Sequence, residues 1–239
     1  MTIDIGRIFS TCIDYVKNNP LIFVPQVLLG VIIFALAFVI IGAAIGGIAI
    51  SPGEITAGAA IGGLFLFVIL AAAASFVTFG WTVSMAAEVV ETGSTSLGSG
   101  FSRFTGNLGQ LLLVGILLFL IIGIGTLLCV IPGIIAAFFL IYAYAAVAYG
   151  GMGAIDALKD SFSLVKEYLV DTIVLVLIAF GLSIGASIVA MILGIVPIIG
   201  ALIGYIIQMA VATFILVLTV QVYRDITEGE EAPEAQPTV

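Results

Sequence analysis

Charged residues divide this chain into long apolar stretches. Four stretches contain no Asp, Glu, Lys or Arg: residues 18–53, 55–87, 104–155 and 172–223. A helix that crosses a bilayer needs about 20 apolar residues. The first two stretches are each long enough for one such helix, and each of the last two is long enough for two helices joined by a tight turn. The pattern therefore predicts an all-α, polytopic integral membrane protein with six transmembrane helices.

Proline marks the turns of the three predicted hairpins. The first turn reads SPGE at 51–54, which has the order of a helix capping box with proline at the first helical position. The other two read CVIP at 129–132 and GIVP at 194–197. In these, two β-branched residues lead into a proline, and the residue before a proline favours an extended conformation. Each hairpin is therefore expected to turn at one proline.

Composition and charge add location and orientation. The chain is 63% hydrophobic and 8% charged, against roughly 25% charged residues in soluble domains. Basic residues favour the cytoplasmic side of a membrane. All six basic residues fall on one side of the predicted topology: Arg7, Lys17, Arg103, Lys159, Lys166 and Arg224. We therefore expect a multi-pass protein of the cell membrane, with both termini in the cytoplasm and the proline turns outside.

The net charge of −8 comes mostly from the end of the chain. From Asp225 the sequence reads DITEGEEAPEAQPTV, which is too polar to fold alone. We expect residues 1–225 to form one six-span membrane domain and residues 226–239 to form a disordered acidic cytoplasmic tail. The tail would either aid solubility or dock a cytoplasmic protein partner. We expect no nucleic-acid partner.

Three segments that precede the odd-numbered spans share one apolar pattern, with spacings of four, three and four. The segments are Ile5-Phe9-Cys12-Val16, Leu97-Phe101-Phe104-Leu108 and Leu158-Phe162-Val165-Leu169. A serine follows the phenylalanine in each copy. This spacing places the apolar side chains on one face of a helix. Amphipathic helices of this kind lie in the membrane interface.

The shared pattern predicts an internal threefold repeat. Each unit would consist of an interfacial amphipathic helix followed by a transmembrane hairpin, with units at about 3–90, 95–150 and 153–224. Phe9, Phe101 and Phe162 would be the interfacial anchors. Chance similarity among amphipathic connecting segments is the alternative explanation.

The hexapeptide GAAIGG occurs at 42–47 and again at 58–63, once in each arm of the first hairpin. Small residues four positions apart let helices approach closely in lipid. We therefore predict that Gly42 and Gly46 pack against Gly58 and Gly62. The sixth span offers a similar small face, formed by Gly200 and Gly204. A contact between copies of the chain, or a substrate passage lined by bare backbone, would use the same glycines.

Catalytic chemistry has little support in the sequence. The chain has no histidine, and no ionisable residue falls near the centre of a predicted span, where such residues usually mark function. Clusters typical of metal sites and phosphate-binding loops are absent from the sequence. We therefore expect no enzyme activity, cofactor or metal. Gln208, Tyr205 and Tyr142 are candidates for a polar cavity, although hydrogen bonds between helices would also account for them.

Three short motifs resemble a known family. They are GAIDALKDS at 153–161, the Ile-Pro-Gly turn at 131–133, and NNPLIFVPQVLL at 18–29. Together they resemble the membrane domain fused to some glycerophosphoryl diester phosphodiesterases and found in related stand-alone bacterial and archaeal proteins. The resemblance implies a six-span membrane domain. It implies no phosphodiesterase activity, because the soluble catalytic domain with its metal site has no counterpart in this sequence.

These observations favour a non-enzymatic protein that organises the bilayer or handles lipid, with membrane lipids as its partners. A permease or channel for a neutral or apolar solute is one alternative, with Gln208, Tyr205 and Tyr142 along its route. A membrane subunit that docks a soluble partner, through the tail or through residues 156–167, is another. Formation of a homo-oligomer is compatible with all three.

Overall fold

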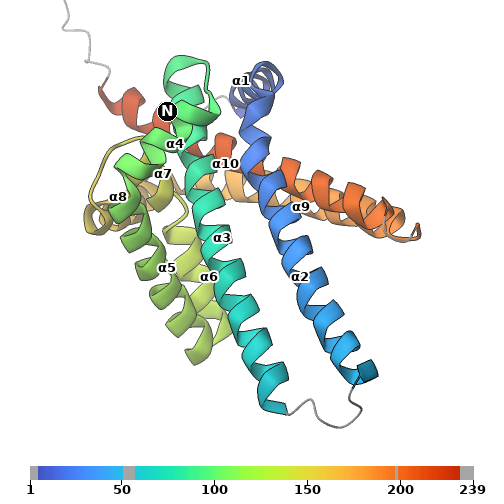
Figure 1. The fold of residues 1–239 in the computed structure, drawn as a ribbon. Helices are drawn as coiled ribbons and strands as arrows, with labels where there is room; N and C mark the ends of the chain where they lie inside the picture. Colours follow the sequence, from blue (N-terminus) through green and yellow to red (C-terminus); the bar gives the residue numbers. More distant parts are fainter. Residues whose placement is uncertain (1–4, 51–56, 197–198, 232–239) are drawn as a thin grey trace, which may run out of the picture.

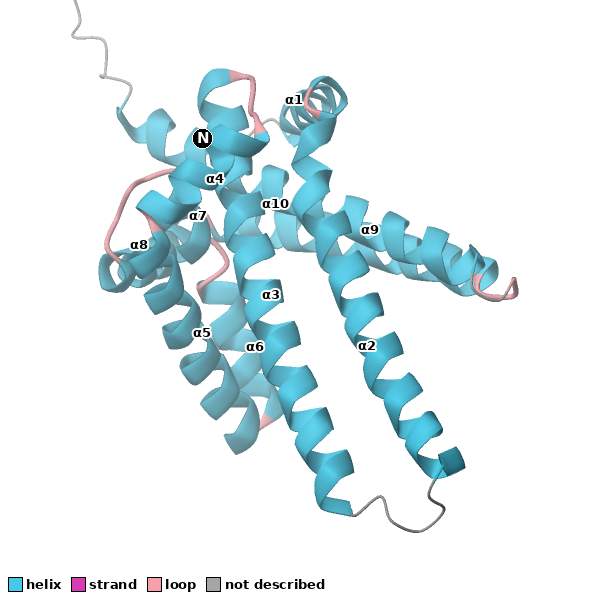
Figure 2. Ribbon diagram, in the orientation of Figure 1, coloured by secondary structure: helices cyan, strands magenta, loops and turns pink. Residues whose placement is uncertain are grey.

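The structure is a computed structural model that describes residues 5–50, 57–196 and 199–231. Over these residues the chain forms ten α-helices and one 3₁₀ helix and no strand (Figures 1 and 2). In chain order they are α1 (Ile5–Asn18), η1 (Pro20–Phe23), α2 (Val24–Ile50), α3 (Ala57–Thr92), α4 (Leu97–Gly106), α5 (Leu108–Leu128), α6 (Val130–Phe139), α7 (Ala143–Ala148), α8 (Ala154–Glu167), α9 (Leu169–Leu193) and α10 (Ile199–Glu231). The predicted all-helical class is confirmed.

Five stretches in the described part of the chain are long and apolar enough to cross a membrane, and they lie in α3, α5, α6 with α7, α9 and α10. A sixth is present if α1 and α2 are counted together as one bent span. The bend between them is 88° and falls at Asn19, directly before Pro20, where the proline ring disfavours helical geometry. The structure therefore contains five or six candidate spans.

The helices form three hairpins that diverge from a common region. Figure 1 shows α2–α3, α5–α6 and α9–α10 running outward from this region, with α9–α10 directed away from the other two hairpins. We call the common region the packed end. It consists of residues 83–90 of α3, α7, residues 217–226 of α10, and the faces of α1, α4 and α8 that cover them. Away from the packed end, many of the described apolar side chains of the hairpins are exposed; Leu127, for example, is 88% exposed.

Three helices form the centre of the packed end. Helices α3, α7 and α10 contact one another, and small residues such as Ala86, Ala87, Ala143 and Ala146 are completely buried between them. Small side chains let helix backbones approach closely, which is the main source of packing energy between helices in lipid. This centre holds the hairpins together, since their outer parts are open.

Two arginines join the ends of these helices. The Arg103 Nε donates to the Ala148 carbonyl at 3.1 Å, at the C-terminus of α7. The Arg224 Nη1 donates to the Val90 carbonyl at 2.6 Å, near the C-terminus of α3. The last carbonyls of a helix lack partners within the helix and carry partial negative charge. Each guanidinium therefore satisfies a helix terminus and links two helices.

Span four is not one continuous helix. Helix α6 ends at Phe139 and α7 begins at Ala143. The buried Ser161 of α8 repairs the break, because its Oγ donates to the Phe139 carbonyl at 3.0 Å and accepts from the Tyr142 N–H at 3.1 Å. Backbone groups in lipid must find partners within the protein, and here one side chain supplies both.

The turn between α5 and α6 is shorter than the sequence suggested. Only Cys129 is extended, with φ −169° and ψ 146°. Pro132 lies in the first turn of α6, where a helix needs no donor from its backbone nitrogen. The predicted capping box at 51–54 and Pro197 lie outside the described residues.

The expectation of a disordered tail is wrong for residues 226–231, because α10 continues to Glu231. Ile226 is 2% exposed, and the Arg224 Nε pairs with Glu228 four residues later at 3.1 Å, a spacing that stabilises helices. The Tyr149 hydroxyl also donates to Glu228. Burial, and then this hydrogen bond, raise the pKa of Tyr149, so the phenol keeps its proton at neutral pH.

Candidate functional site

A cavity of about 350 Å³ lies where α3, α7, α9 and α10 meet. Its walls are mostly apolar, with Phe79 of α3 and Val211 and Ile215 of α10 among them. Four neutral side chains that can form hydrogen bonds also line it: Tyr144, Ser183, Gln208 and Thr219. No charged side chain among the described residues lines the cavity. Pockets for small molecules have this composition and a volume of about 300 to 1,000 Å³.

The cavity is closed toward the packed end. Val83, Ala145 and Val220 line it and also belong to the buried core. The residues farther from the packed end are more accessible, since Gln208 is half-buried and Ala212 is exposed. A molecule would therefore reach the cavity from the side of the hairpins, not through the packed end.

Gln208 is held by a chain of hydrogen bonds between α10 and α9. Its Nε2 donates to the Ser187 Oγ at 2.9 Å, and the Ser187 hydroxyl donates to the Ser183 carbonyl at 2.8 Å. The Ser183 hydroxyl donates in turn to the Ala179 carbonyl at 2.7 Å. These bonds fix the glutamine side chain at the cavity wall.

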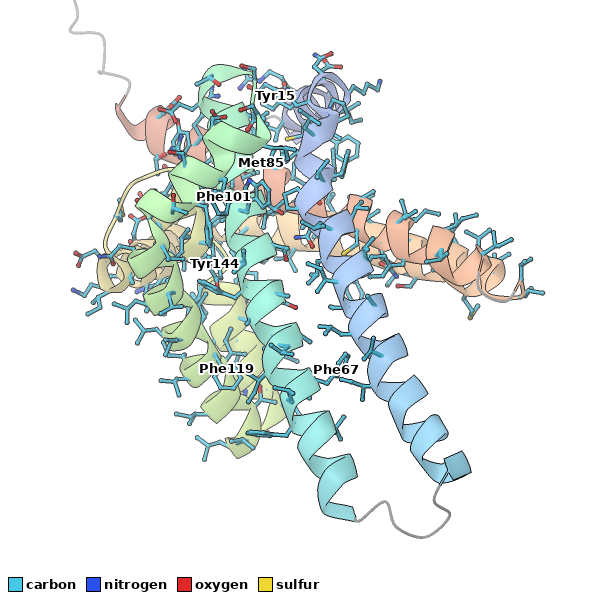
Figure 3. All side chains as sticks on the ribbon, in the orientation of Figure 1. Tyr15, Phe67, Met85, Phe101, Phe119 and Tyr144 are labelled. Atoms are coloured by element: carbon cyan, nitrogen blue, oxygen red, sulfur yellow. The ribbon has the colours of Figure 1, made fainter. Side chains whose placement is uncertain are left out.

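Tyr144 is positioned by two neighbouring helices. Its ring packs edge-on against Phe79 of α3, with the centroids 4.7 Å apart, and its hydroxyl lies beside Gly115 of α5, where a Cβ would come within 2.8 Å of it. Tyr144 is labelled in Figure 3, as is Phe119, which lies farther along α5 and is 76% exposed. The cavity wall at Tyr144 is therefore supported on its far side by α5.

The structure separates the three residues proposed for a polar cavity. Only Gln208 lines the cavity. Tyr205 crosses to α2, where its ring lies against Gly30 and its hydroxyl donates to the Gln26 carbonyl at 3.5 Å. Tyr142 is completely buried, with its hydroxyl 3.2 Å from the Thr172 Oγ1. Both tyrosines join helices to one another instead of facing the cavity.

Sequence reasoning did not single out Ser183 and Ser187. Their four-residue spacing on the fifth span was the available signal, because it places both on the face of one helix. The signal becomes specific only when α10 is known to bring Gln208 opposite them.

The glycines proposed for helix packing have different surroundings. The surroundings of Gly42, Gly46 and Gly58 lie outside the described residues. No described atom lies within 4 Å of a Cβ built at Gly62. Gly204 has close neighbours, because its Cβ would lie 3.1 Å from the Ala190 Cα of α9.

Gly200 is closer still to α9, where a Cβ would overlap the Leu193 carbonyl. Gly200 and Gly204 of α10 thus both lie against α9. A packing role for the GAAIGG copies stays a prediction.

The three phenylalanines proposed as interfacial anchors all contact aromatic rings of other helices. Phe9 packs edge-on against Phe214 of α10, with centroids 5.2 Å apart. Phe101 does the same against Trp81 of α3 at 5.1 Å. Phe162 lies 4.9 Å from the ring of Phe139. Phe101 and Phe162 are 43% and 47% exposed, so each presents one side outward. Their role as membrane anchors stays a prediction.

Metal ligands do not gather in the described ranges, which contain no group of three His, Cys, Asp or Glu residues placed to hold an ion. The site is thus an apolar cavity with neutral polar groups, set among helices long enough to cross a bilayer. Fold and cavity together define a multi-pass helical membrane protein.

Residues 99–226, more than half of the chain, match a family described as "Domain of unknown function (DUF7847)". The chain belongs to this family. The match includes the cavity residues of α7, α9 and α10 and excludes Phe79 and Val83 of α3. Comparison with curated proteins and with solved structures gives no match. These comparisons do not test the resemblance to membrane domains of glycerophosphoryl diester phosphodiesterases.

Proposed function

We propose that this protein handles lipid without catalysing a reaction, and that the cavity beside Gln208 takes up part of a lipid molecule from the surrounding bilayer. The observation that carries the proposal is the direction in which the cavity is accessible. Core residues Val83, Ala145 and Val220 close it toward the packed end, while Ala212, at the other side, is exposed. In a membrane, that exposed side faces lipid.

The orientation proposed from the sequence agrees with this arrangement. All six basic residues lie on α1, α4, α8 and the last part of α10, which are the helices of the packed end. Because basic residues favour the cytoplasmic side, we assign the packed end to the cytoplasm. The three amphipathic helices would then lie on one leaflet, where they can organise lipid.

A permease for a neutral or apolar solute is the second candidate. The cavity supports it to the extent that Gln208 offers a polar group within a span. A permease, however, needs a route through the packed end, where the side chains of α3, α7 and α10 are buried. Lipid uptake from the side needs no such route, so the closed packed end favours it.

Filling the cavity should reduce lipid binding. Ala212 is exposed and lines the cavity, so Ala212→Trp would occupy the space without entering the core. Ala72→Trp is the matched control, since Ala72 is exposed on α3 and does not line the cavity. Native mass spectrometry of protein extracted gently from its own membranes would count the lipids that remain bound.

We expect wild type and Ala72→Trp to retain a lipid at fixed stoichiometry, and Ala212→Trp to lose at least about nine-tenths of it, a tenfold change that corresponds to about 1.4 kcal/mol. Equal retention by all three proteins would contradict lipid binding in the cavity. Solute flux through liposomes containing the wild type, abolished by Ala212→Trp, would support the permease instead.

A further inference from the structure

We propose that the cavity selects an uncharged lipid with a free hydroxyl group, such as a diacylglycerol, over lipids with phosphate headgroups. This inference rests on the proposed lipid-handling function and concerns the class of lipid. It depends on which hydrogen-bonding capacity the cavity leaves unused. It also depends on where the charges of the protein lie.

The serine and threonine hydroxyl groups that line the cavity already donate their hydrogens to backbone carbonyls. The Ser183 hydroxyl donates to the Ala179 carbonyl at 2.7 Å, and the Thr219 hydroxyl donates to the Ile215 carbonyl at 2.8 Å. A hydroxyl oxygen that has donated its hydrogen can still accept. Ser183 and Thr219 therefore offer acceptors to a bound molecule and no donors.

The orientation of Gln208 follows from its neighbour. Ser187 donates its only hydroxyl hydrogen to the Ser183 carbonyl, so toward Gln208 it can only accept. The amide nitrogen of Gln208 must therefore face Ser187, as the 2.9 Å contact requires. The carbonyl oxygen Oε1 of Gln208 is left as a further acceptor.

Acceptors thus outnumber donors around the cavity. Four side-chain oxygens, from Tyr144, Ser183, Gln208 and Thr219, can accept, whereas the Tyr144 hydroxyl hydrogen and the second N–H of Gln208 are the donors not used in a described hydrogen bond. A ligand that matches this set supplies a donor of its own. A hydroxyl group does so, while a phosphate diester, an ester or an ether supplies only acceptors.

Charge excludes phosphate on separate grounds. No described side chain that lines the cavity is basic, and the six Lys and Arg residues belong to helices of the packed end. Moving an unpaired ionised group into apolar surroundings is far more costly than moving a hydroxyl group that finds a hydrogen bond. A phosphate in this cavity would meet oxygen acceptors and apolar walls.

The position of Gln208 along α10 supports the selection of a lipid with a neutral headgroup. Gln208 lies nine residues after Ile199, the first residue of α10, or about 14 Å along the helix at 1.5 Å per residue. A bilayer core is about 30 Å thick, so Gln208 would lie near the middle of a bilayer that α10 crosses from a boundary at Ile199. Lipids with a single hydroxyl can place their polar end at that depth, where charged lipids cannot.

Three lipid probes with identical acyl chains separate the effect of the free hydroxyl from the effect of the phosphate charge. Dioleoylglycerol carries the free hydroxyl, its acetyl-capped form lacks the donor, and dioleoyl phosphatidic acid adds charge. Purified full-length protein in nanodiscs would be given each probe in competition with a photoactivatable dioleoylglycerol, and crosslinks to residues 208–220 would be measured by mass spectrometry. We expect dioleoylglycerol to compete about tenfold better than either other probe, since one net hydrogen bond contributes about 1 kcal/mol or slightly more.

Substitutions test which side chains of the cavity produce the preference for dioleoylglycerol. Gln208→Leu and Ser183→Ala should each reduce the advantage of dioleoylglycerol over its acetyl-capped form. Ser75→Ala is the matched control, because the half-buried Ser75 also donates to a carbonyl four residues earlier, at 2.7 Å, and does not line the cavity. A thermal melt of each variant checks that the fold persists, and Ser183→Ala keeps the test valid if Gln208→Leu fails to fold.

The outcomes distinguish this inference from the function on which it rests. Crosslinking to the cavity with equal competition by all three probes would overturn the selectivity and leave lipid binding intact. Stronger competition by phosphatidic acid would also overturn it. Absence of any crosslink to residues 208–220 would overturn both.

Discussion

Gly133 shows how closely two backbones approach in the α5–α6 hairpin. A Cβ on Gly133 would lie 2.9 Å from the Thr126 backbone nitrogen and 3.0 Å from its Cα. A Cβ on Gly125 would lie 3.1 Å from the Gly133 Cα. These neighbours are backbone atoms and cannot rotate away, so a side chain at either position would push the two helices apart.

We expect Gly133→Ala to lower the free energy of unfolding by about 1–3 kcal/mol, the usual effect of overpacking. Gly123→Ala is the matched control in the same hairpin, because a Cβ there has no described atom within 4 Å. Alanine favours helix by up to about 1 kcal/mol over glycine, so the control should melt no lower than wild type. Thermal melts in one detergent would compare them, and equal midpoints for the two variants would contradict the close contact.

The sequence indicated only some of these glycine contacts. Gly200 and Gly204 were found because small residues four apart predict close packing, and both lie against α9. Gly30 was not found, because it accommodates the ring of Tyr205, which is distant in the chain. A glycine that receives a side chain from another helix carries no spacing pattern of its own. Its role depends on which helices meet.

At the scale of the helix, the break in span four depends on a side chain from α8. Ser161 gives and receives one hydrogen bond across the break. Ser161→Ala would leave the Phe139 carbonyl and the Tyr142 N–H without this partner, and an unsatisfied buried group costs about 1–3 kcal/mol. For a chain of this size each 1 kcal/mol lowers the melting midpoint by about 2–4 °C. We therefore expect a clear loss of thermal stability.

Ser163→Ala is the control for this prediction, since Ser163 is exposed on the same helix and donates only to the Asp160 carbonyl. Its melting midpoint should stay close to that of wild type. If Ser161→Ala had the same melting midpoint as Ser163→Ala, the Ser161 hydroxyl would not stabilise the break between α6 and α7.

Apolar runs predicted where the spans lie, but they could not predict this break. Residues 130–148 are uniformly apolar around it, and its polar partner comes from a later helix. The same limit explains the tail. Composition suggested that residues 226–231 are disordered, yet Ile226 is buried and Glu228 pairs with Arg224. The break depends on hydrogen bonds from α8, and the burial of Ile226 depends on the packing of α10 at the packed end.

At the scale of the whole molecule, the two cysteines report the orientation. Cys12 is completely buried at the packed end, whereas Cys129 is exposed at the tip of α5–α6. If the packed end is cytoplasmic, a membrane-impermeant maleimide added to intact cells should label Cys129 and leave Cys12 unmodified. Mass spectrometry of the purified protein would locate the label.

A Cys129→Ala protein is the control and should remain unlabelled in intact cells. Labelling of Cys129 only after the cells are permeabilised would reverse the proposed orientation. Labelling of Cys12 in the folded protein would contradict its burial.

The packed end draws buried residues from the whole chain, and its last contributors are residues 217–226 of α10, including Tyr223 and Ile226. A ribosome makes these residues after those of the first two hairpins. Until then α3 and α7 lack one of the three helices of their centre, and Arg224 cannot yet cap α3. The core of the nascent protein is therefore incomplete until α10 has been made and has packed against α3 and α7. We expect a chain cut short before residue 217 to lack the buried residues that α10 contributes and to be less stable than the full chain.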